Sequence, residues 1–175
     1  MNELCLNMIV SRRSIRQYSA RPVEEQVIEQ ILRAAMNAPS ANNQQPWQFI
    51  VVTKREKMVE ITKFHPWSKM LLNAPVAVLV VADLDRVVSK GDMQDTWIQD
   101  CSAATQNALL AAHAQGVGGV WLGLYPDGRR VENVRKLFNI PEGKVPFSII
   151  SLGYPAEQPR VRDRYDLNRV HWEQW

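Results

Sequence analysis

An uninterrupted apolar run, APVAVLVVA at residues 74–82, constrains the fold of this 175-residue chain more than any other feature. A strand with no polar face has to be covered on both sides, as happens at the centre of a sheet. The run is far too short to cross a lipid bilayer, which takes about 20 apolar residues in a helix. It therefore predicts a central strand of a buried sheet.

Helices and strands are predicted along the rest of the chain. In VEEQVIEQILRAAMNAP, residues 23–39, apolar side chains recur every three or four positions up to Pro39, which indicates a helix. Three more strands are predicted in WQFIVVT (47–53), GVGGVWLGLY (116–125) and VPFSIISLGYP (145–155). Further helices are expected at 3–10, 55–63, 94–115 and 129–138. This pattern predicts a mixed α/β layer fold in one domain, residues 1–175.

The longest predicted helix, at 94–115, carries little charge. One of its faces is formed by Trp97, Cys101, Thr105, Ala108 and Ala112. Such a helix is either the central helix of the domain or a contact surface between two copies of the chain.

Composition and charge exclude some classes of protein. Hydrophobic residues make up 46% of the chain, charged residues 22%, and the formal net charge is +3. This charge is too small to suggest the broad basic face of a nucleic-acid binder. The N-terminus MNELCLNMIVSRRS has no basic segment before an apolar run, so no signal peptide is predicted. Cys5 and Cys101 form no metal or redox pattern, and a reducing cytoplasm is the expected setting.

Arginine is concentrated near both ends of the chain. SRRSIRQYSARPV, residues 11–23, contains four arginines and no carboxylate. If Arg12 and Arg16 lie one helical turn apart, their guanidinium groups and the Ser14 hydroxyl converge on one phosphate. In PRVRDR, Arg160 and Arg162 alternate along an extended segment and would reach the same anion. The alternative is a solvated basic patch.

Two other stretches are suited to contact with a flat ligand. The loop SANNQQP, residues 40–46, offers the amide and hydroxyl groups that bind the edge of a heterocycle. Its alternative is a surface loop of turn-forming residues. Glycines in GVGGVWLG allow a flat ligand to approach the backbone, although a tight turn into an ordinary strand explains the first three of them.

Several catalytic motifs are missing from the sequence. It contains no HExxH, P-loop or nucleophile elbow, and GVGGVWLG does not fit the GxGxxG pattern of a dinucleotide fold. His65, His113 and His171 are widely separated, so no metal site is predicted.

The C-terminal segment AEQPRVRDRYDLNRVHWEQW has no periodicity that would fold it alone. It ends in Trp172 and Trp175, whose indoles are costly to leave in water. Packing on a second copy of the chain would cover them, which predicts a homodimer. The alternative is a tail that folds back on its own domain.

Taken together, SRRSIRQYSARPV, APSANNQQPWQF, GVGGVWLG and LGYPAEQPRVRDR resemble the FMN-dependent nitroreductase family in their order and spacing. The resemblance covers essentially the whole chain, which is similar to the short members of that family. It implies an α+β, three-layer fold with a mostly antiparallel central sheet flanked by helices. It also implies an intertwined homodimer with FMN at the subunit interface. In that dimer the tail, residues 156–175, would wrap around the partner subunit.

The resemblance also implies which residues bind FMN. Arg12, Arg160 and Arg162 would contact the phosphate. Ser14 would reach the flavin and Arg16 would lie toward its ring. Ser40 and Asn43 would approach from the partner subunit, and Trp121, Leu122 and Gly123 would lie along the isoalloxazine. The complete set of candidate cofactor-binding residues is Arg12, Arg13, Ser14, Arg16, Pro39, Ser40, Asn43, Trp121, Leu122, Gly123, Arg160 and Arg162.

The implied activity is transfer of electrons from NAD(P)H through FMN to a nitroaromatic, a quinone or a similar oxidised small molecule. The chemistry would belong to the flavin, so no catalytic side chain is assigned. Three alternatives stay open: a flavin-consuming or dehalogenating enzyme, a flavin carrier without activity, and a nucleic-acid binder that uses the terminal arginines. The last two are expected to show no electron transfer, and binding of nucleic acid would weaken steeply with salt.

Overall fold

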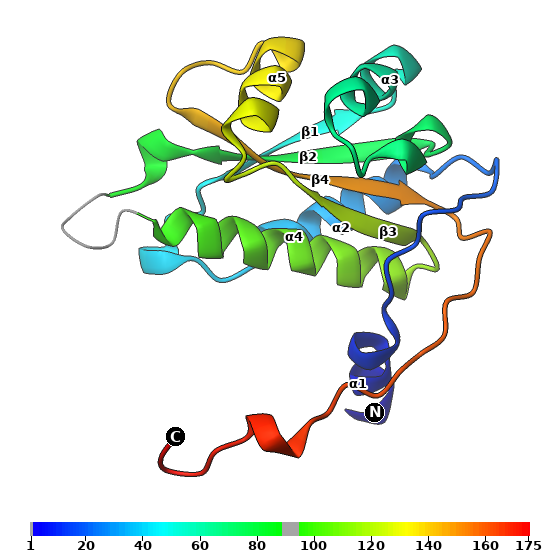
Figure 1. Ribbon diagram of the computed structural model, residues 1–175, viewed down its shortest axis with the longest axis vertical. Coiled ribbons are helices and arrows are strands. Elements are labelled where there is room, and N and C mark those ends of the chain that lie inside the picture. Colours follow the sequence, from blue (N-terminus) through cyan, green and yellow to red (C-terminus); the bar gives the residue numbers. More distant parts are fainter. Residues whose placement is uncertain (1, 89–94) are drawn as a thin grey trace.

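A computed structural model describes residues 2–88 and 95–175 of the chain. A four-stranded sheet lies at its centre (Figure 1), in the order β1-β2-β4-β3, and each neighbouring pair is antiparallel. The strands are β1 (Trp47–Val52), β2 (Val76–Asp83), β3 (Gly118–Gly123) and β4 (Lys144–Gly153). The predicted central strand is confirmed, because β2 is an inner strand and is buried along its whole length.

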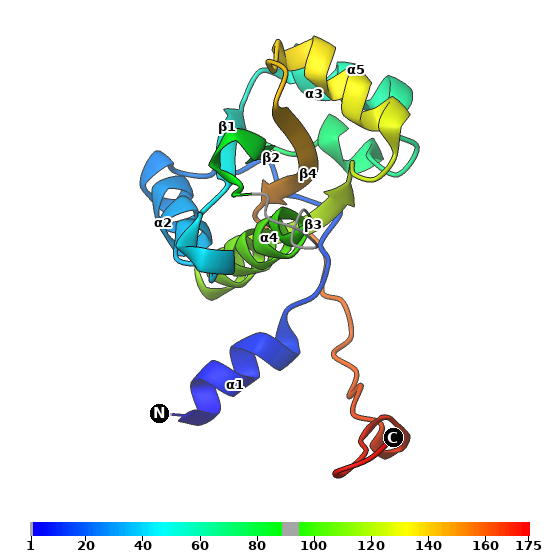
Figure 2. The same ribbon diagram turned by 90° about the vertical axis from the view of Figure 1, so that its left-hand side faces the viewer.

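Helices cover both faces of this sheet, which gives three layers (Figures 1 and 2). On one face lie α3 (Arg55–Phe64) and α5 (Gly128–Phe138). On the other lie α2 (Glu25–Met36) and α4 (Thr96–Ala114). The α+β layer fold expected from the resemblance is therefore present in the chain.

Alternation along β2 explains why its sequence has no polar face. Val76, Val78 and Val80 join the core beneath α2 and α4. Ala77 and Leu79 join the separate core beneath α3 and α5. Because successive side chains of a strand point to opposite faces, a strand between two helical layers has to be apolar at every position.

The predicted helices form at the expected places, with small differences at their ends. α2 begins two residues later than predicted and ends before Pro39, and Met36, its last residue, is 49% exposed. Residue 94, expected at the start of a helix, lies outside the described residues, and α4 begins at Thr96. The predicted apolar face of α4 is buried, and the helix packs on both α2 and the sheet, as a central helix does.

The two chain ends leave the layered body side by side (Figures 1 and 2). Helix α1 (Asn2–Ser11) and the segment after Tyr154 form what we call the N-terminal and C-terminal arms. As expected from the tail's lack of periodicity, its regular structure is a single short 3-10 turn, η5 (Leu167–Arg169). Among the residues that the structure describes, no helix combines the length and apolar character needed to cross a bilayer.

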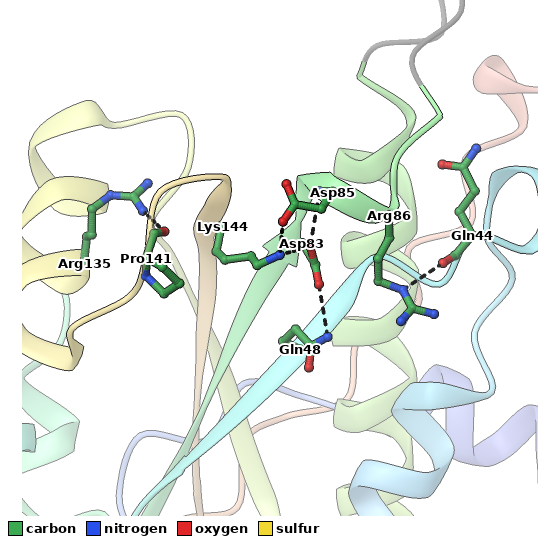
Figure 3. Close-up of polar contacts among 8 residues, drawn as sticks. All are labelled: Gln44, Gln48, Asp83, Asp85, Arg86, Arg135, Pro141 and Lys144. Carbon is green, nitrogen blue, oxygen red and sulfur yellow. Dashed lines mark hydrogen bonds and ion pairs between the residues drawn. The ribbon is translucent and has the colours of Figure 1, made fainter.

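A cluster of ion pairs joins the ends of β2 and β4 (Figure 3). Lys144 contacts both Asp83 and Asp85, and Asp83 also accepts a hydrogen bond from Gln48 at 3.3 Å. Burial alone would raise the pKa of Asp83, but the Lys144 ammonium holds it below its usual value. Each of these charged groups has a partner within the cluster, so we interpret it as a structural tie across the sheet.

Candidate functional site

Residues 12–18 follow α1 and run beside β3 without forming a helix. Ser14 pairs with Gly119 in a parallel bridge, and the Ile15 N–H donates to the Gly119 carbonyl at 3.0 Å. A side chain at Gly118 would lie 2.7 Å from Ile15, so this close approach depends on a glycine there. The segment is thereby held against the sheet.

Glu157 fixes the same segment from the C-terminal arm. Its carboxylate accepts hydrogen bonds from the backbone N–H groups of Arg16 at 2.6 Å and Gln17 at 3.1 Å. The Ala156 N–H donates to the Gln17 carbonyl at 2.9 Å. These contacts bring the two sequence-distant arginine stretches together.

The first hollow of the site lies between the two arms, and we call it the arginine hollow. It has a volume of about 560 Å³ and is lined by Ile9, Val10, Arg12, Arg13, Val161, Arg162, Asp163, Arg164 and Tyr165. One guanidinium N–H of Arg13 donates to the Arg162 carbonyl at 3.0 Å. Burial, together with the neighbouring charges of Arg13 and Arg164, lowers the pKa of Arg12. Four guanidinium groups with a single carboxylate among them make this hollow suited to an anion.

The second hollow lies at the end of β3, and we call it the β3 hollow. Its volume is also about 560 Å³, and its lining consists of Arg16, His65, Pro66, Trp67, Lys69, Met70, Val120, Trp121, Leu122, Gly123 and Arg130. Two indoles and three cations line it, and no carboxylate does. Flat aromatic walls with positive charge beside them suit a flat heterocycle that carries or acquires negative charge.

Two side chains that line the β3 hollow, His65 and Arg130, hold the end of β3 in place. The Gly123 carbonyl lies 3.0 Å from His65 Nε2 and accepts a hydrogen bond from Arg130 at 3.2 Å. His65 is 2% exposed, and its burial lowers its pKa, so the neutral ring donates from Nε2. His65 Nδ1 is buried and has no partner among the described residues.

The polar loop at 39–45 lies near the start of α4, where it contacts Asp100. Asn42, Asn43 and Gln45 have positive φ values of 50°, 54° and 50°, an uncommon backbone conformation for side chains other than glycine. The Asp100 carboxylate accepts a hydrogen bond from the Ala41 N–H at 2.9 Å, and the Ser40 hydroxyl accepts one from the Gln45 N–H at 3.0 Å.

The far end of this loop is held by Gln44, whose carbonyl accepts a hydrogen bond from Arg86 at 3.3 Å (Figure 3). The loop's shape is therefore set by contacts with α4 and with the turn after β2.

The structure brings some of the predicted site residues together and keeps others apart. Arg12, Arg13 and Arg162 line the arginine hollow, whereas Arg16, Trp121, Leu122 and Gly123 line the β3 hollow. The one-turn spacing expected for Arg12 and Arg16 is not adopted, because their segment pairs with β3, and the two side chains line different hollows. Arg160 is exposed and is not among the residues that line the arginine hollow.

Neither hollow is lined by Pro39, Ser40 or Asn43 of the same chain. Their loop is tied to Asp100 near the start of α4, while the arms contact His113 near its end, through a 2.8 Å contact with Ser11. Thirteen residues of helix separate those two positions, which corresponds to about 20 Å.

Sequence reasoning missed several lining residues. Arg164 continues the alternation of Arg160 and Arg162, and that pattern was available in PRVRDR. His65, Trp67, Lys69 and Arg130 have no local motif, because it is the packing of α3 and α5 on the sheet that brings them to the end of β3.

A hollow for a flat heterocycle and a hollow for an anion on the same segment suit a ligand that joins an aromatic ring to a phosphate. The comparisons with known proteins agree. The model of the Nitroreductase family matches residues 9–68 and 62–154. A protein of Methanothermobacter thermautotrophicus, named "Putative NADH dehydrogenase/NAD(P)H nitroreductase", is 51% identical over 170 residues, which cover 97% of this chain and 87% of that protein.

Solved structures show the same similarity. The FMN-dependent nitroreductase of Clostridium difficile R20291 has a TM-score of 0.88 and 30% identity, and the match covers 97% of this chain and 99% of that one. A Desulfovibrio desulfuricans protein, named "a putative nitroreductase in complex with fmn", has a TM-score of 0.81 and 28% identity, and the match covers 98% of this chain and 97% of that one. This chain belongs to the Nitroreductase family, and by that relationship it is an oxidoreductase.

Proposed function

We propose that this chain binds FMN and transfers electrons from NAD(P)H to an oxidised aromatic molecule, and that it does so as a homodimer. The observation that carries the proposal is the pair of hollows, one lined by arginines and one by aromatic, apolar and cationic groups, to both of which the segment 12–18 contributes. Arg12 and Arg16 mark the two hollows and are at most about 13 Å apart along a fully extended chain. A ligand with a phosphate at one end and a flat ring at the other fits this arrangement.

The residues in place suit each part of FMN. In this proposal Arg12, Arg13 and Arg162 bind the phosphate, and Arg164 adds to the positive charge there. Ser14 lies between Arg12 and Arg16 in the sequence, and in this proposal it contacts the ribityl chain. Trp121, Leu122 and Gly123 line one side of the flavin ring, and Arg16 supplies a positive charge next to it.

When bound, FMN would supply the hydride chemistry. The protein's part is to orient the ring, to exclude water from one side of it with β3, and to place a cation where negative charge develops. Reduction of a nitro group to a nitroso group consumes one NAD(P)H and one proton and releases NAD(P)⁺ and water. The donor and the acceptor would occupy the open side of the β3 hollow in turn, as in a ping-pong reaction.

The arms support the dimer. Their exposed apolar side chains include Leu4, Leu6, Ile9, Val10, Val161, Tyr165, Leu167, Trp172 and Trp175. So many large exposed apolar side chains on two short segments are unusual for a monomer, and binding of a second copy would cover them. In the dimer the tail, residues 156–175, would wrap the partner, and the loop with Pro39, Ser40 and Asn43 would complete the partner's flavin site. Arg160 would turn toward the phosphate in the same assembly.

The test is an absorption spectrum of the freshly purified protein, followed by an assay of NADH and NADPH oxidation with a nitroaromatic or a quinone. We expect the spectrum of bound FMN and turnover that depends on the acceptor. A colourless protein that does not take up added FMN would overturn the proposal. Bound flavin without NAD(P)H oxidation would reduce it to a flavin carrier.

A further inference from the structure

The C-terminal arm leaves the body alongside the segment that carries the N-terminal arginines. The Ser19 N–H donates a hydrogen bond to the Tyr154 carbonyl at 2.9 Å. Two residues further along the arm, the Ala156 N–H donates to the Gln17 carbonyl, also at 2.9 Å. These two bonds between backbone groups fix the point at which the arm begins.

Glu157 follows directly and anchors the next part of the arm. It is partly buried, whereas every other residue from 155 to 165 is exposed. Its carboxylate accepts the hydrogen bonds from the backbone N–H groups of residues 16 and 17. Beyond Glu157, among the residues that the structure describes, one hydrogen bond connects the arm to the rest of the chain, from Arg13 to the Arg162 carbonyl. Glu157 is therefore the principal anchor of the stretch that carries the C-terminal arginines.

The carboxylate of Glu157 binds backbone groups and forms no ion pair with an arginine within the described part of the chain. The guanidinium groups of Arg162 and Arg164, which line the arginine hollow, are in no ion pair there either. A negative charge near an anion site weakens anion binding by Coulomb repulsion. Glu157 can therefore favour an anion in the hollow only through the position that its hydrogen bonds give the arm.

We propose that Glu157 is a positioning residue for phosphate binding, which holds the C-terminal arm so that Arg162 and Arg164 stay at the arginine hollow. This inference rests on the proposed function, in which that hollow takes the phosphate of FMN. Residues 12–18 would keep their place without Glu157, because their pairing with β3 holds them independently. Binding of the flavin ring is therefore expected to be insensitive to Glu157, and binding of the phosphate to depend on it.

The test compares FMN with riboflavin, which has the same ring and ribityl chain but no phosphate. Each is titrated into the apoprotein and followed by flavin fluorescence. In Glu157→Ala we expect the dissociation constant of FMN to rise about tenfold, as for loss of one charge-assisted contact, and that of riboflavin to stay within about twofold of wild type. Repulsion alone would give the opposite sign for FMN, because the variant removes a negative charge.

Two further variants separate position from charge. Glu157→Gln removes the charge but keeps an oxygen that accepts the same hydrogen bonds, so its dissociation constant for FMN should lie within about threefold of wild type. Glu56→Ala removes an exposed carboxylate at the start of α3 and is the matched control, with no change expected for either ligand. The inference is overturned if Glu157→Ala binds FMN at least as tightly as wild type, or if it weakens FMN and riboflavin equally.

Limited digestion with trypsin measures the anchor without any flavin. In the flavin-free protein, Glu157→Ala should be cut between residues 160 and 165 several-fold faster than wild type, and Glu157→Gln at about the wild-type rate. Mass spectrometry locates the cuts. An unchanged rate in Glu157→Ala would overturn the inference whether or not flavin binds. A wild-type protein that binds neither FMN nor riboflavin would instead overturn the proposed function itself.

Discussion

The layered body and the two arms contain similar apolar residues but place them in opposite surroundings. In the body, Leu79 and Ile150 are about 1% and 0% exposed between the helical layers. In the arms, Leu167 and Trp172 are 67% and 82% exposed. The body completes its core within one chain, whereas the arms leave large apolar side chains exposed. The core and the surface that the proposed dimer would cover therefore lie in separate parts of this chain, and the segment 12–18, which contributes to both hollows, lies between them.

The largest expected effect comes from removing core volume in the body. Leu79→Ala deletes a buried side chain from the core beneath α3 and α5, and we expect unfolding to become easier by about 2–5 kcal/mol. Urea unfolding monitored by circular dichroism measures this change. A loss below about 1 kcal/mol would contradict the description of β2 as the centre of the core.

The second prediction concerns the C-terminal arm. Trp172→Ala combined with Trp175→Ala should leave the circular dichroism spectrum unchanged and weaken the proposed dimer by about 2–4 kcal/mol, the loss typical of tryptophans in an interface. Sedimentation velocity over a range of concentrations measures the dissociation. Lys54→Gln, on the body, is the control. A double variant that dimerises as the wild type does would show that the tail packs elsewhere.

Sequence patterns predicted most of the helices and strands of the body but little of the geometry of the site. The run at 74–82 identified β2, because a strand buried on both faces has to be apolar at every position. Periodicity identified α2 and α4 in the same way. The arginine clusters predict an anion site, and that stays a prediction, whereas the helical spacing predicted for Arg12 and Arg16 is not adopted. Pairing of Ser14 with Gly119, a contact between residues far apart in the sequence, decides their separation instead.

Long-range packing also explains why sequence patterns did not predict some of the residues that line the β3 hollow. His65 follows α3 and Arg130 lies in α5. The two side chains meet at the Gly123 carbonyl. No local pattern encodes such a meeting, since it follows from how two helices cover the same face of a sheet.

The third prediction tests the junction between body and arms. Arg12→Ala should weaken FMN binding by about 1.5–3 kcal/mol, which is roughly 10- to 150-fold in the dissociation constant, because a charge-assisted contact with the phosphate is lost. Retention of flavin on dialysis and fluorescence titration of the apoprotein measure it. Arg33→Ala, at an exposed ion pair with Glu29 on α2, should leave binding unchanged. Equal retention of flavin by Arg12→Ala and wild type would remove Arg12 from the phosphate site.

The smallest expected effect concerns Asp100, which connects the body to the loop at 39–45. Its side chain is buried, one oxygen accepts the hydrogen bond from Ala41, and the other has no partner among the described residues. Burial raises the pKa of Asp100 above its usual value. The unfolded chain therefore ionises more readily than the folded one. Asp100 contributes most to stability below its unfolded pKa of about 3.9, and that contribution falls as the pH rises through the higher folded value.

Two substitutions separate the charge of Asp100 from its hydrogen bond. Asp100→Asn keeps an acceptor for the Ala41 N–H and removes the buried charge, so it should be more stable than wild type at pH 7, and the difference should disappear as the pH approaches 4. Asp100→Ala loses the hydrogen bond and should be less stable than Asp100→Asn by about 1 kcal/mol at any pH. Thermal unfolding between pH 4 and pH 8 measures both. If Asp100→Asn were less stable than wild type at pH 7, the ionised carboxylate would have a partner, which the dimer would then have to supply.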